Sequence, residues 1–396
     1  MSDNLDPIVI VAATRTPVGG LMGLLSETSA PQLGAIAIKA AIERAAIAAD
    51  EIDQVIMGCV LAAGLGQAPA RQASLGAGLP LAAGCVTINK MCGSGMKAVM
   101  DAHDQIKAGT SAVMVAGGME NMSQSPYLLP KARSGMRMGH GQVLDSMFYD
   151  GLEDAFEGGL MGTFAQATAD SYGVSREGMD DFAIESLRRA NQAISQGWFD
   201  TEIAPVTVKA RGREESIISV DEQPGKANPD KIPKLRPAFS KEGTITAANA
   251  SSISDGGAAL VLMRESDALT RGLQPLARIV GHMTHAQQPA EFSIAPIQAI
   301  KKLMEKISWT KDDVDLFEIN EAFAVVTMLA TQELALDPAK VNIHGGACAL
   351  GHPIGCSGAR ILVTLIYALK RLGKQRGIAS LCIGGGEATA MAIEIV

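Results

Sequence analysis

Short, mostly apolar runs alternate along this chain with longer segments whose apolar residues recur at helical spacing. Residues 8–12, 52–57 and 111–116 are such short runs, which predicts buried strands. Residues 30–49 and 96–107 have apolar positions three and four apart, which predicts helices. Strands that alternate with helices predict an α/β fold with a parallel or mixed sheet.

The second half of the chain repeats the order of elements found in the first half. Residues 50–55 and 312–317 share one pattern without a gap, 262 residues apart. The predicted strand before Gly117 runs into two glycines, as does the predicted strand before Gly384. A repeat of this length favours two similar α/β domains packed face to face over an array of short modules.

The middle of the chain has no counterpart in the repeat. Residues 120–275 are therefore predicted to be an insertion between two similar halves. Within the insertion, residues 221–237 are rich in Pro and Lys, which predicts an exposed loop.

Composition and charge restrict the class of protein. Hydrophobic residues make up 47% and charged residues 19% of the 396 residues, which is typical of a globular chain. A net charge of -8 argues against general nucleic-acid binding. No apolar run approaches the roughly 20 residues that span a bilayer. Residues 1–7 are polar and lack a secretory signal pattern, so we expect a cytoplasmic protein without membrane insertion.

The cysteine pattern indicates free thiols. None of the six forms a C-x-x-C pair, so neither a zinc site nor a thioredoxin-like motif is indicated. We expect no metal site and no tightly held redox cofactor. The ordinary role of any one cysteine is that of a small buried hydrophobic residue. The six are Cys59, Cys85, Cys92, Cys348, Cys356 and Cys382.

Cys92 stands where a predicted strand passes through a loop into a helix. Gly93 and Gly95 allow a tight turn there, as in a nucleophile elbow. Backbone N–H groups and the helix dipole at such a position are expected to lower the pKa of the thiol. On position alone, a reactive cysteine and a packed one are equally good interpretations.

A second segment, residues 344–358, holds two histidines among five glycines. His352 precedes a proline, which favours an extended backbone, and it could act as a base for a thiol. For His344 we favour a structural, hydrogen-bonding role.

Two further positions follow predicted strands. Cys382 ends the last strand and precedes the run Gly384–Gly386, whose N–H groups could point at an oxyanion. Asn320 follows the strand at residues 316–319 and could hold a water or donate to an oxyanion. The ordinary alternative is that Asn320 caps a helix.

Together these segments resemble the signature sequences of the thiolase family. The matching residues are 89–96, 320–324, 345–360 and 382–386, and the likeness extends over essentially the whole chain. Within the family, the chain is most similar to the acetyl-CoA C-acetyltransferase branch. The resemblance implies duplicated α/β/α domains in five layers. It also implies an N-terminal half at residues 1–119, an inserted loop domain at 120–250, a return to the N-terminal half at 251–275 and a C-terminal half at 276–396. The loop domain would bind coenzyme A (CoA) and form oligomer contacts.

The resemblance also implies a mechanism and site roles. Cys92 would be the acylated nucleophile, and His352 would take its proton. Cys382 would be the acid/base at the substrate α-carbon. Asn320 would hold a water that forms one oxyanion hole with His352, and the backbone N–H groups of Cys92 and Gly384 would form the other. The reaction would be a reversible condensation of two acetyl-CoA to acetoacetyl-CoA and CoA, within fatty acid metabolism. CoA would enter as substrate or product, without another cofactor.

Family likeness further assigns substrate and partner contacts. Ser251 would contact the pantetheine, and Leu160 and Met161 would line the acyl pocket. Residues 123–140 resemble the loop that joins two dimers into a homotetramer. Leu160 stands where relatives usually carry His, and Glu387 where they often carry Met. For the nucleotide of CoA, possible contacts are Lys226, Lys231 and Lys234.

The altered pocket leaves a second activity open. A degradative 3-ketoacyl-CoA thiolase would act on longer or branched acyl chains. A thiolase-like protein that binds without turnover should lack a catalytic member, yet Cys92, His352, Cys382 and Asn320 are all present. A ketoacyl synthase would be expected to use two histidines and one cysteine, which the segment at Cys382 does not fit.

Overall fold

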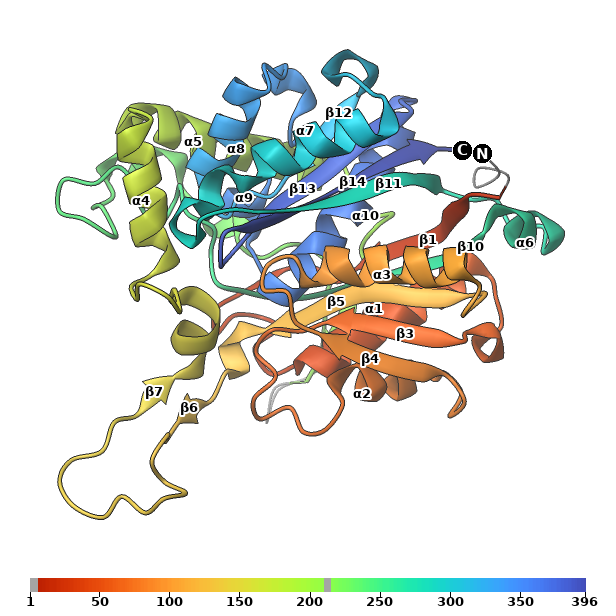
Figure 1. Ribbon diagram of the computed structural model, residues 1–396, viewed down its shortest axis with the longest axis horizontal. Helices are drawn as coiled ribbons and strands as arrows, with labels where there is room; N and C mark the ends of the chain where they lie inside the picture. The colour runs from red at the N-terminus through yellow and green to blue at the C-terminus, as the bar shows by residue number, and fades with distance from the viewer. Residues whose placement is uncertain (1–5, 210–214) are drawn as a thin grey trace.

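A large mixed sheet forms the centre of the computed structural model, which describes residues 6–209 and 215–396 (Figure 1). The prediction of a cytoplasmic location rested on residues 1–7, and residues 1–5 of these lie outside the described range. The ten strands, in order across the sheet, are β12 (Leu316–Ile319), β13 (Arg376–Ile383), β14 (Glu387–Ile395), β11 (Ala277–Ala286), β1 (Ile8–Arg15), β10 (Ser254–Arg264), β5 (Met114–Asn121), β3 (Gln54–Gly58) and β4 (Gly84–Ile88), with β2 (Gly19–Gly20) beside β10.

The sheet contains two four-strand units with the same internal order, which run across the sheet in opposite directions and meet at their last strands. In one half β3, β5, β10 and β1 are neighbours, and in the other β12, β13, β14 and β11 follow the same order. In each unit the first pair is parallel and the next two pairs are antiparallel. The units meet where β1 pairs with β11 at Val9–Arg278 and Ile10–Ala277. The predicted duplication is therefore confirmed, and the two sheets are joined edge to edge.

Helices cover both units and fill the space between them, which gives the expected five layers (Figure 1). The N-terminal unit is covered by α1 (Ala30–Ala45) and α2 (Pro69–Gly76), and the C-terminal unit by α7 (Ala295–Ile307) and α8 (Ala324–Glu333). The middle layer contains α3 (Ser94–Ala108) and α10 (Ile354–Leu372).

The two middle helices approach so closely that only glycine fits at their crossing. A Cβ on Gly95 would lie 2.7 Å from the backbone N of Ala359, and one on Gly358 would lie 2.4 Å from that of Met96. This contact explains why Ser94-Gly95 and Ser357-Gly358 recur in the repeat. Nearly all of α10 is buried by its neighbours. Among the described residues, no helix is long and apolar enough to cross a membrane.

The inserted region packs against one end of the two units. Its helices are α4 (Met161–Ser171) and α5 (Arg176–Ser195), and its small strand pairs are β6 (Tyr127–Leu128) with β7 (Leu144–Asp145) and β8 (Val206–Val208) with β9 (Ser216–Ile218). The β6–β7 arm projects away from the body (Figure 1). The remaining short α-helices are α6 (Glu265–Thr270), after β10, and α9 (Ala347–Leu350), before α10.

The prediction that residues 221–237 form an exposed loop is wrong at its start. Asp221 is buried, and its carboxylate oxygens accept from Nη1 and Nη2 of Arg15 at 2.7 and 2.9 Å. Glu202 accepts from Nε of the same guanidinium at 2.5 Å. A Pro- and Lys-rich composition could not indicate this contact, because the partner arginine lies about 200 residues earlier.

Candidate active site

One cavity of about 460 Å³ collects most of the predicted site residues. It opens between the two units and the inserted region, and its lining is mainly apolar. Asn320 is not among the described residues that line it. The predicted residues in the lining are Cys92, Leu160, Met161, Ser251, His352, Cys382 and Gly384.

Cys92 lies on a tight turn between β4 and α3. The preceding residue, Met91, has a φ of 46°, which is unusual for a residue with a side chain. Ser94 fixes the turn, because its Oγ accepts from the N–H of Lys90 at 2.8 Å and donates to the carbonyl of Met91 at 2.6 Å. A Cβ on Gly93 would lie 2.4 Å from Cδ1 of Ile383, so this turn packs closely against the end of β13.

The expected lowering of the Cys92 pKa is wrong in its net direction. Burial raises the pKa of the thiol to about 11, although the backbone N–H groups of Gly384 and of Cys92 itself act to lower it. The buried carboxylate of Glu120 adds to the rise. Position near a helix start could not indicate how strongly the site is desolvated. Cys92 is therefore a neutral thiol at rest and needs a base.

His352 is held as a neutral imidazole with one nitrogen available. Its Nδ1 lies 2.6 Å from Oγ of Ser357, which donates to the carbonyl of Pro353 at 3.0 Å. Because the serine hydroxyl already donates its proton to Pro353, it can only accept from His352. Nδ1 of His352 therefore carries the proton, and Nε2 carries the lone pair. Nε2 is buried and has no partner among the described residues. Burial and then Arg360 lower the pKa of His352 to about 3.

The sequence analysis did not assign a role to Ser357. It lies five residues after His352, in the first turns of α10, and is fully buried. A signal is present in the sequence: Ser-Gly occurs at residues 94–95 and again at 357–358, and Ser94 also fixes a turn at the start of a middle helix. A serine in a glycine-rich segment is otherwise a common turn residue.

Cys382 is the second thiol of the cavity. It lies near the end of β13, and the turn to β14 uses Gly385 and Gly386 with φ of 90° and 85°. Burial and the neighbouring Cys92 raise the pKa of Cys382 well above the usual value. From the glycine run, the backbone N–H of Gly384 acts to lower the pKa of Cys92. The cavity thus holds two neutral thiols beside one unprotonated imidazole nitrogen.

Asn320 does not cap a helix, so that ordinary alternative is wrong. It follows β12, but α8 begins only at Ala324, with Phe323 as the capping residue. The Asn320 Oδ1 accepts from Nη2 of Arg360 at 3.4 Å. Its buried Nδ2 has no partner among the described residues, which leaves two N–H donors for a water.

Glu120 is a buried carboxylate that the sequence analysis did not identify. It lies next to the last residue of β5 and accepts from the backbone N–H groups of Val60, Leu61 and Gly355 at 3.0, 3.1 and 2.9 Å. Burial nevertheless raises its pKa to about 7. These bonds tie the N-terminal unit to the start of α10. Glu120 lies four residues beyond the predicted strand 111–116, at the predicted start of the insertion, so nothing in the sequence indicates that it is buried.

Aromatic rings and sulfur form the apolar wall of the cavity. Phe239 and Phe292 each pack edge-on against Phe323, with ring centroids 6.1 and 6.2 Å apart. Leu160 lies at the start of α4, and the adjacent Met161 faces Gly384. A wall of this kind suits an acyl chain rather than a charged group.

His344 lies outside this cavity. Its Nε2 is 2.7 Å from Nη2 of Arg371, and its ring packs on Trp198 with centroids 5.2 Å apart. Burial and then the two cations Arg371 and Arg15 lower its pKa to about 3. These contacts agree with a structural role.

Comparison with known proteins gives the same family over the full length. A model of the thiolase N-terminal domain matches residues 8–266, and a model of the thiolase C-terminal domain matches residues 273–395. The acetyl-CoA acetyltransferase of Escherichia coli K12 is 51% identical over 389 residues, covering 98% of both chains. That of Cupriavidus necator is 47% identical over 389 residues, covering 98% of this chain and 99% of that protein.

Solved structures agree in fold. The Bacillus anthracis acetyl-CoA acetyltransferase matches with a TM-score of 0.97 and 44% identity, covering 100% of both chains. The Acat5 thiolase of Ascaris suum, in complex with coenzyme A, matches with a TM-score of 0.93 and 41% identity, covering 98% of this chain and 100% of that chain. The duplicated fold, the paired thiols and these matches establish that the chain belongs to the thiolase family.

Proposed function

We propose that this thiolase is an acetyl-CoA C-acetyltransferase of fatty acid metabolism that condenses two acetyl-CoA reversibly to acetoacetyl-CoA and CoA. The observation that carries the proposal is that Cys92, Cys382 and His352 line one cavity. Relatives named acetyl-CoA acetyltransferase, 46–51% identical over nearly their whole length, support the short acyl chain.

The first half-reaction is acyl transfer to Cys92. Nε2 of His352 takes the thiol proton, and the thiolate attacks the acetyl carbonyl. The carbon–sulfur bond to CoA then breaks, and the departing CoA thiolate takes the proton of Cys382. The acetyl group is left on Cys92, His352 is protonated, and Cys382 is a thiolate.

The second half-reaction forms the carbon–carbon bond. The Cys382 thiolate removes an α-proton from a second acetyl-CoA, whose enolate oxygen is stabilised by protonated His352 and a water on Asn320. The enolate carbon attacks the acetyl group on Cys92, while the N–H groups of Cys92 and Gly384 stabilise the oxyanion. Cys92 then leaves as a thiolate and recovers its proton from His352.

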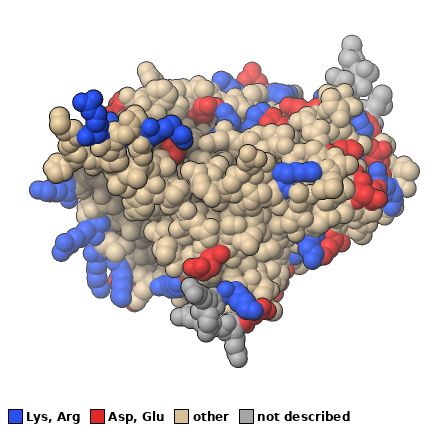
Figure 2. Space-filling model, turned by 90° about the horizontal axis from the view of Figure 1, so that it is seen from below, with Lys and Arg blue, Asp and Glu red and all other residues tan. Residues whose placement is uncertain are grey.

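CoA would extend from this cavity toward a neighbouring one. Ser251 and Ser252 line the acyl cavity, and Ser252 also lines a second cavity of about 270 Å³ that includes Lys226 and Lys231. Lys226 pairs with Glu222, so Lys231 is the better phosphate partner. Lys and Arg side chains gather on the left of the lower face, the side of the inserted region in Figure 1 (Figure 2).

The inserted region also supports a homotetramer. The β6–β7 arm exposes apolar side chains that a second copy could bury, among them Tyr127, Met138 and Val143 at 68%, 91% and 60% exposure. Light scattering on the full chain should therefore give a mass about four times 41.2 kDa.

A cytoplasmic location is supported by the cysteines, all six of which are free.

A comparison of substrates tests the proposed activity. Thiolysis rates are measured with acetoacetyl-CoA and with 3-ketoacyl-CoA substrates of medium or branched chain. We expect the highest kcat/KM for the four-carbon substrate. Little activity on it, with efficient cleavage of longer or branched chains, would instead assign the degradative 3-ketoacyl-CoA thiolase activity.

A further inference from the structure

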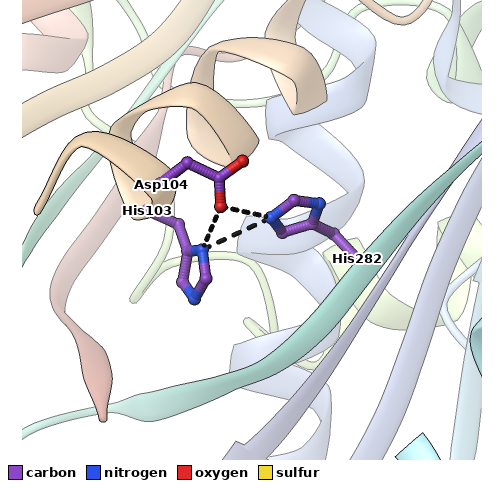
Figure 3. A group of neighbouring side chains, drawn as sticks. All are labelled: His103, Asp104 and His282. Atoms are coloured by element: carbon purple, nitrogen blue, oxygen red, sulfur yellow. Dashed lines mark hydrogen bonds and ion pairs between the residues drawn. The ribbon is translucent and has the colours of Figure 1, made fainter. Parts of the chain in front are cut away.

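Three side chains that could ligate a metal meet near the C-terminal end of α3, whereas Cys92 precedes the start of this helix. His103 and Asp104 lie near the end of α3, and His282 lies on β11 of the other unit. His103 Nδ1, Asp104 Oδ1 and His282 Nε2 point toward one another (Figure 3). Asp104 Oδ1 is 2.8 Å from His103 Nδ1 and 3.0 Å from His282 Nε2, and the two nitrogens are 3.3 Å apart.

These separations are close to those of ligands around one small cation. Tetrahedral bonds of about 2.0–2.1 Å place ligand atoms roughly 3.3–3.5 Å apart. An opening of a few tenths of an ångström would therefore admit an ion. In neutral rings whose protons lie on the other nitrogens, His103 Nε2 and His282 Nδ1, the lone pairs of His103 Nδ1 and His282 Nε2 face Asp104 Oδ1. A cation at this point would be shared by these three atoms and would relieve the repulsion between their lone pairs.

We propose that His103, Asp104 and His282 bind one divalent transition-metal ion of the zinc type, with water in the open position. Two imidazoles and a carboxylate are ligands suited to Zn²⁺, whereas Mg²⁺ and Ca²⁺ prefer oxygen. The imidazoles are 13% exposed and the Asp104 side chain is 56% exposed, so an ion and its water have access.

The surroundings both help and limit binding. Lys107, Lys97 and Lys306 are close enough to affect the rings, and their charge opposes a second cation. The carboxylate offsets part of this charge. We therefore expect a site of moderate affinity that joins α3 to β11 and so ties the two units together.

Calorimetric titration of the chelator-treated full chain with Zn²⁺ tests the proposal. We expect one ion per chain, with at least tenfold weaker binding in Asp104→Asn and in His282→Asn. Asp104→Asn keeps the size of an exposed side chain, so it should fold even if His282→Asn does not. His285→Asn, on the same strand but outside the cluster, should bind as the parent does. Zn²⁺ should also raise the Tm of the parent but not that of Asp104→Asn.

Co²⁺ distinguishes this cluster from the active-site thiols. Nitrogen and oxygen ligands should give visible bands without a sulfur-to-cobalt charge-transfer band in the near ultraviolet. Unchanged Zn²⁺ affinity in Asp104→Asn would overturn the proposal. A thiolate charge-transfer band that disappears in Cys92→Ala would also overturn it, because the ion would then occupy the catalytic cavity.

Discussion

Oγ of Ser357 lies 2.6 Å from Nδ1 of His352 and donates its own proton to the carbonyl of Pro353. The serine thereby determines which imidazole nitrogen carries the proton and leaves Nε2 as the acceptor. Since burial keeps Cys92 protonated, with a pKa of about 11, its activation depends on this nitrogen.

Ser357→Ala should slow acylation of Cys92 while the protein stays folded. Without the acceptor, Nδ1–H loses its partner and the other tautomer becomes accessible. General-base catalysis contributes roughly 10²–10⁴-fold, so partial loss should lower the acylation rate by about 10- to 100-fold. Rapid-mixing measurement of acyl-enzyme formation checks this.

Thr364→Ala is the matched control for Ser357→Ala. Thr364 is a buried hydroxyl on the same helix, and it donates to Glu202 at 3.1 Å. Its removal should affect stability but not the acylation rate. An equal decrease of the acylation rate in both variants would mean that a disturbance of helix α10, and not a change of the His352 tautomer, slows the reaction.

The sequence predicted the architecture better than it predicted the electrostatics of the site. The repeat between residues 50–55 and 312–317 predicted the duplicated units, because hydrophobic pattern and order are local properties. Cys92 was placed correctly on a turn, yet its pKa shift was predicted in the wrong direction, because desolvation depends on residues from several elements. His103 and His282 are 179 positions apart, so their proximity had no sequence signal.

Lys90 and Glu387 join the Cys92 loop to the turn after Gly384. Their side chains form an ion pair and are 20% and 33% exposed. Glu387→Met should loosen the Cys92 loop relative to the Gly384 N–H and leave Lys90 unpaired. A partly exposed pair contributes up to about 1 kcal/mol, so the acylation rate should fall about fivefold.

A double-mutant cycle separates this ion pair from general packing. Combining Lys90→Met with Glu387→Met removes both charges, and the loss should be smaller than the sum of the single losses. Additive losses would show that the two residues act independently.

Lys231→Ala should weaken CoA binding without changing the chemistry. The lysine lines the second cavity and is exposed, so loss of one phosphate contact should raise the KM for CoA about fivefold at unchanged kcat. Lys234→Ala is the control, since that lysine does not line the cavity. An equal rise in KM in both variants would indicate only a general effect of charge.

The buried His344 should make stability depend on pH. Its folded pKa is lowered to about 3, whereas an unfolded histidine titrates near 6.5. The unfolded state therefore binds more protons below pH 6.5, and stability is lost as the pH falls from 6.5 toward 3. Between pH 8 and pH 5 the loss from this group is about 2 kcal/mol.

His344→Gln should remove that part of the pH dependence. Urea unfolding of both proteins at pH 8 and pH 5 gives the two differences in unfolding free energy. Loss of the packing on Trp198 changes the unfolding free energy of the variant by a similar amount at each pH. The test therefore compares, between the two proteins, the difference in unfolding free energy between pH 8 and pH 5. Parallel curves for parent and variant would contradict the assigned pKa.

The division of labour between Cys92 and Cys382 is the central claim. Its most direct measurement is a single turnover of Cys382→Ala with acetyl-CoA, followed by mass spectrometry of the intact chain and by assay of acetoacetyl-CoA. In Cys382→Ala we expect an acetyl adduct on Cys92, formed more slowly because the departing CoA thiolate must take its proton from protonated His352 or from water, and no detectable condensation product. In Cys92→Ser we expect adduct formation to be far slower than in the parent. Loss of the adduct and of the product together in Cys382→Ala, or a normal adduct rate in Cys92→Ser, would contradict the account.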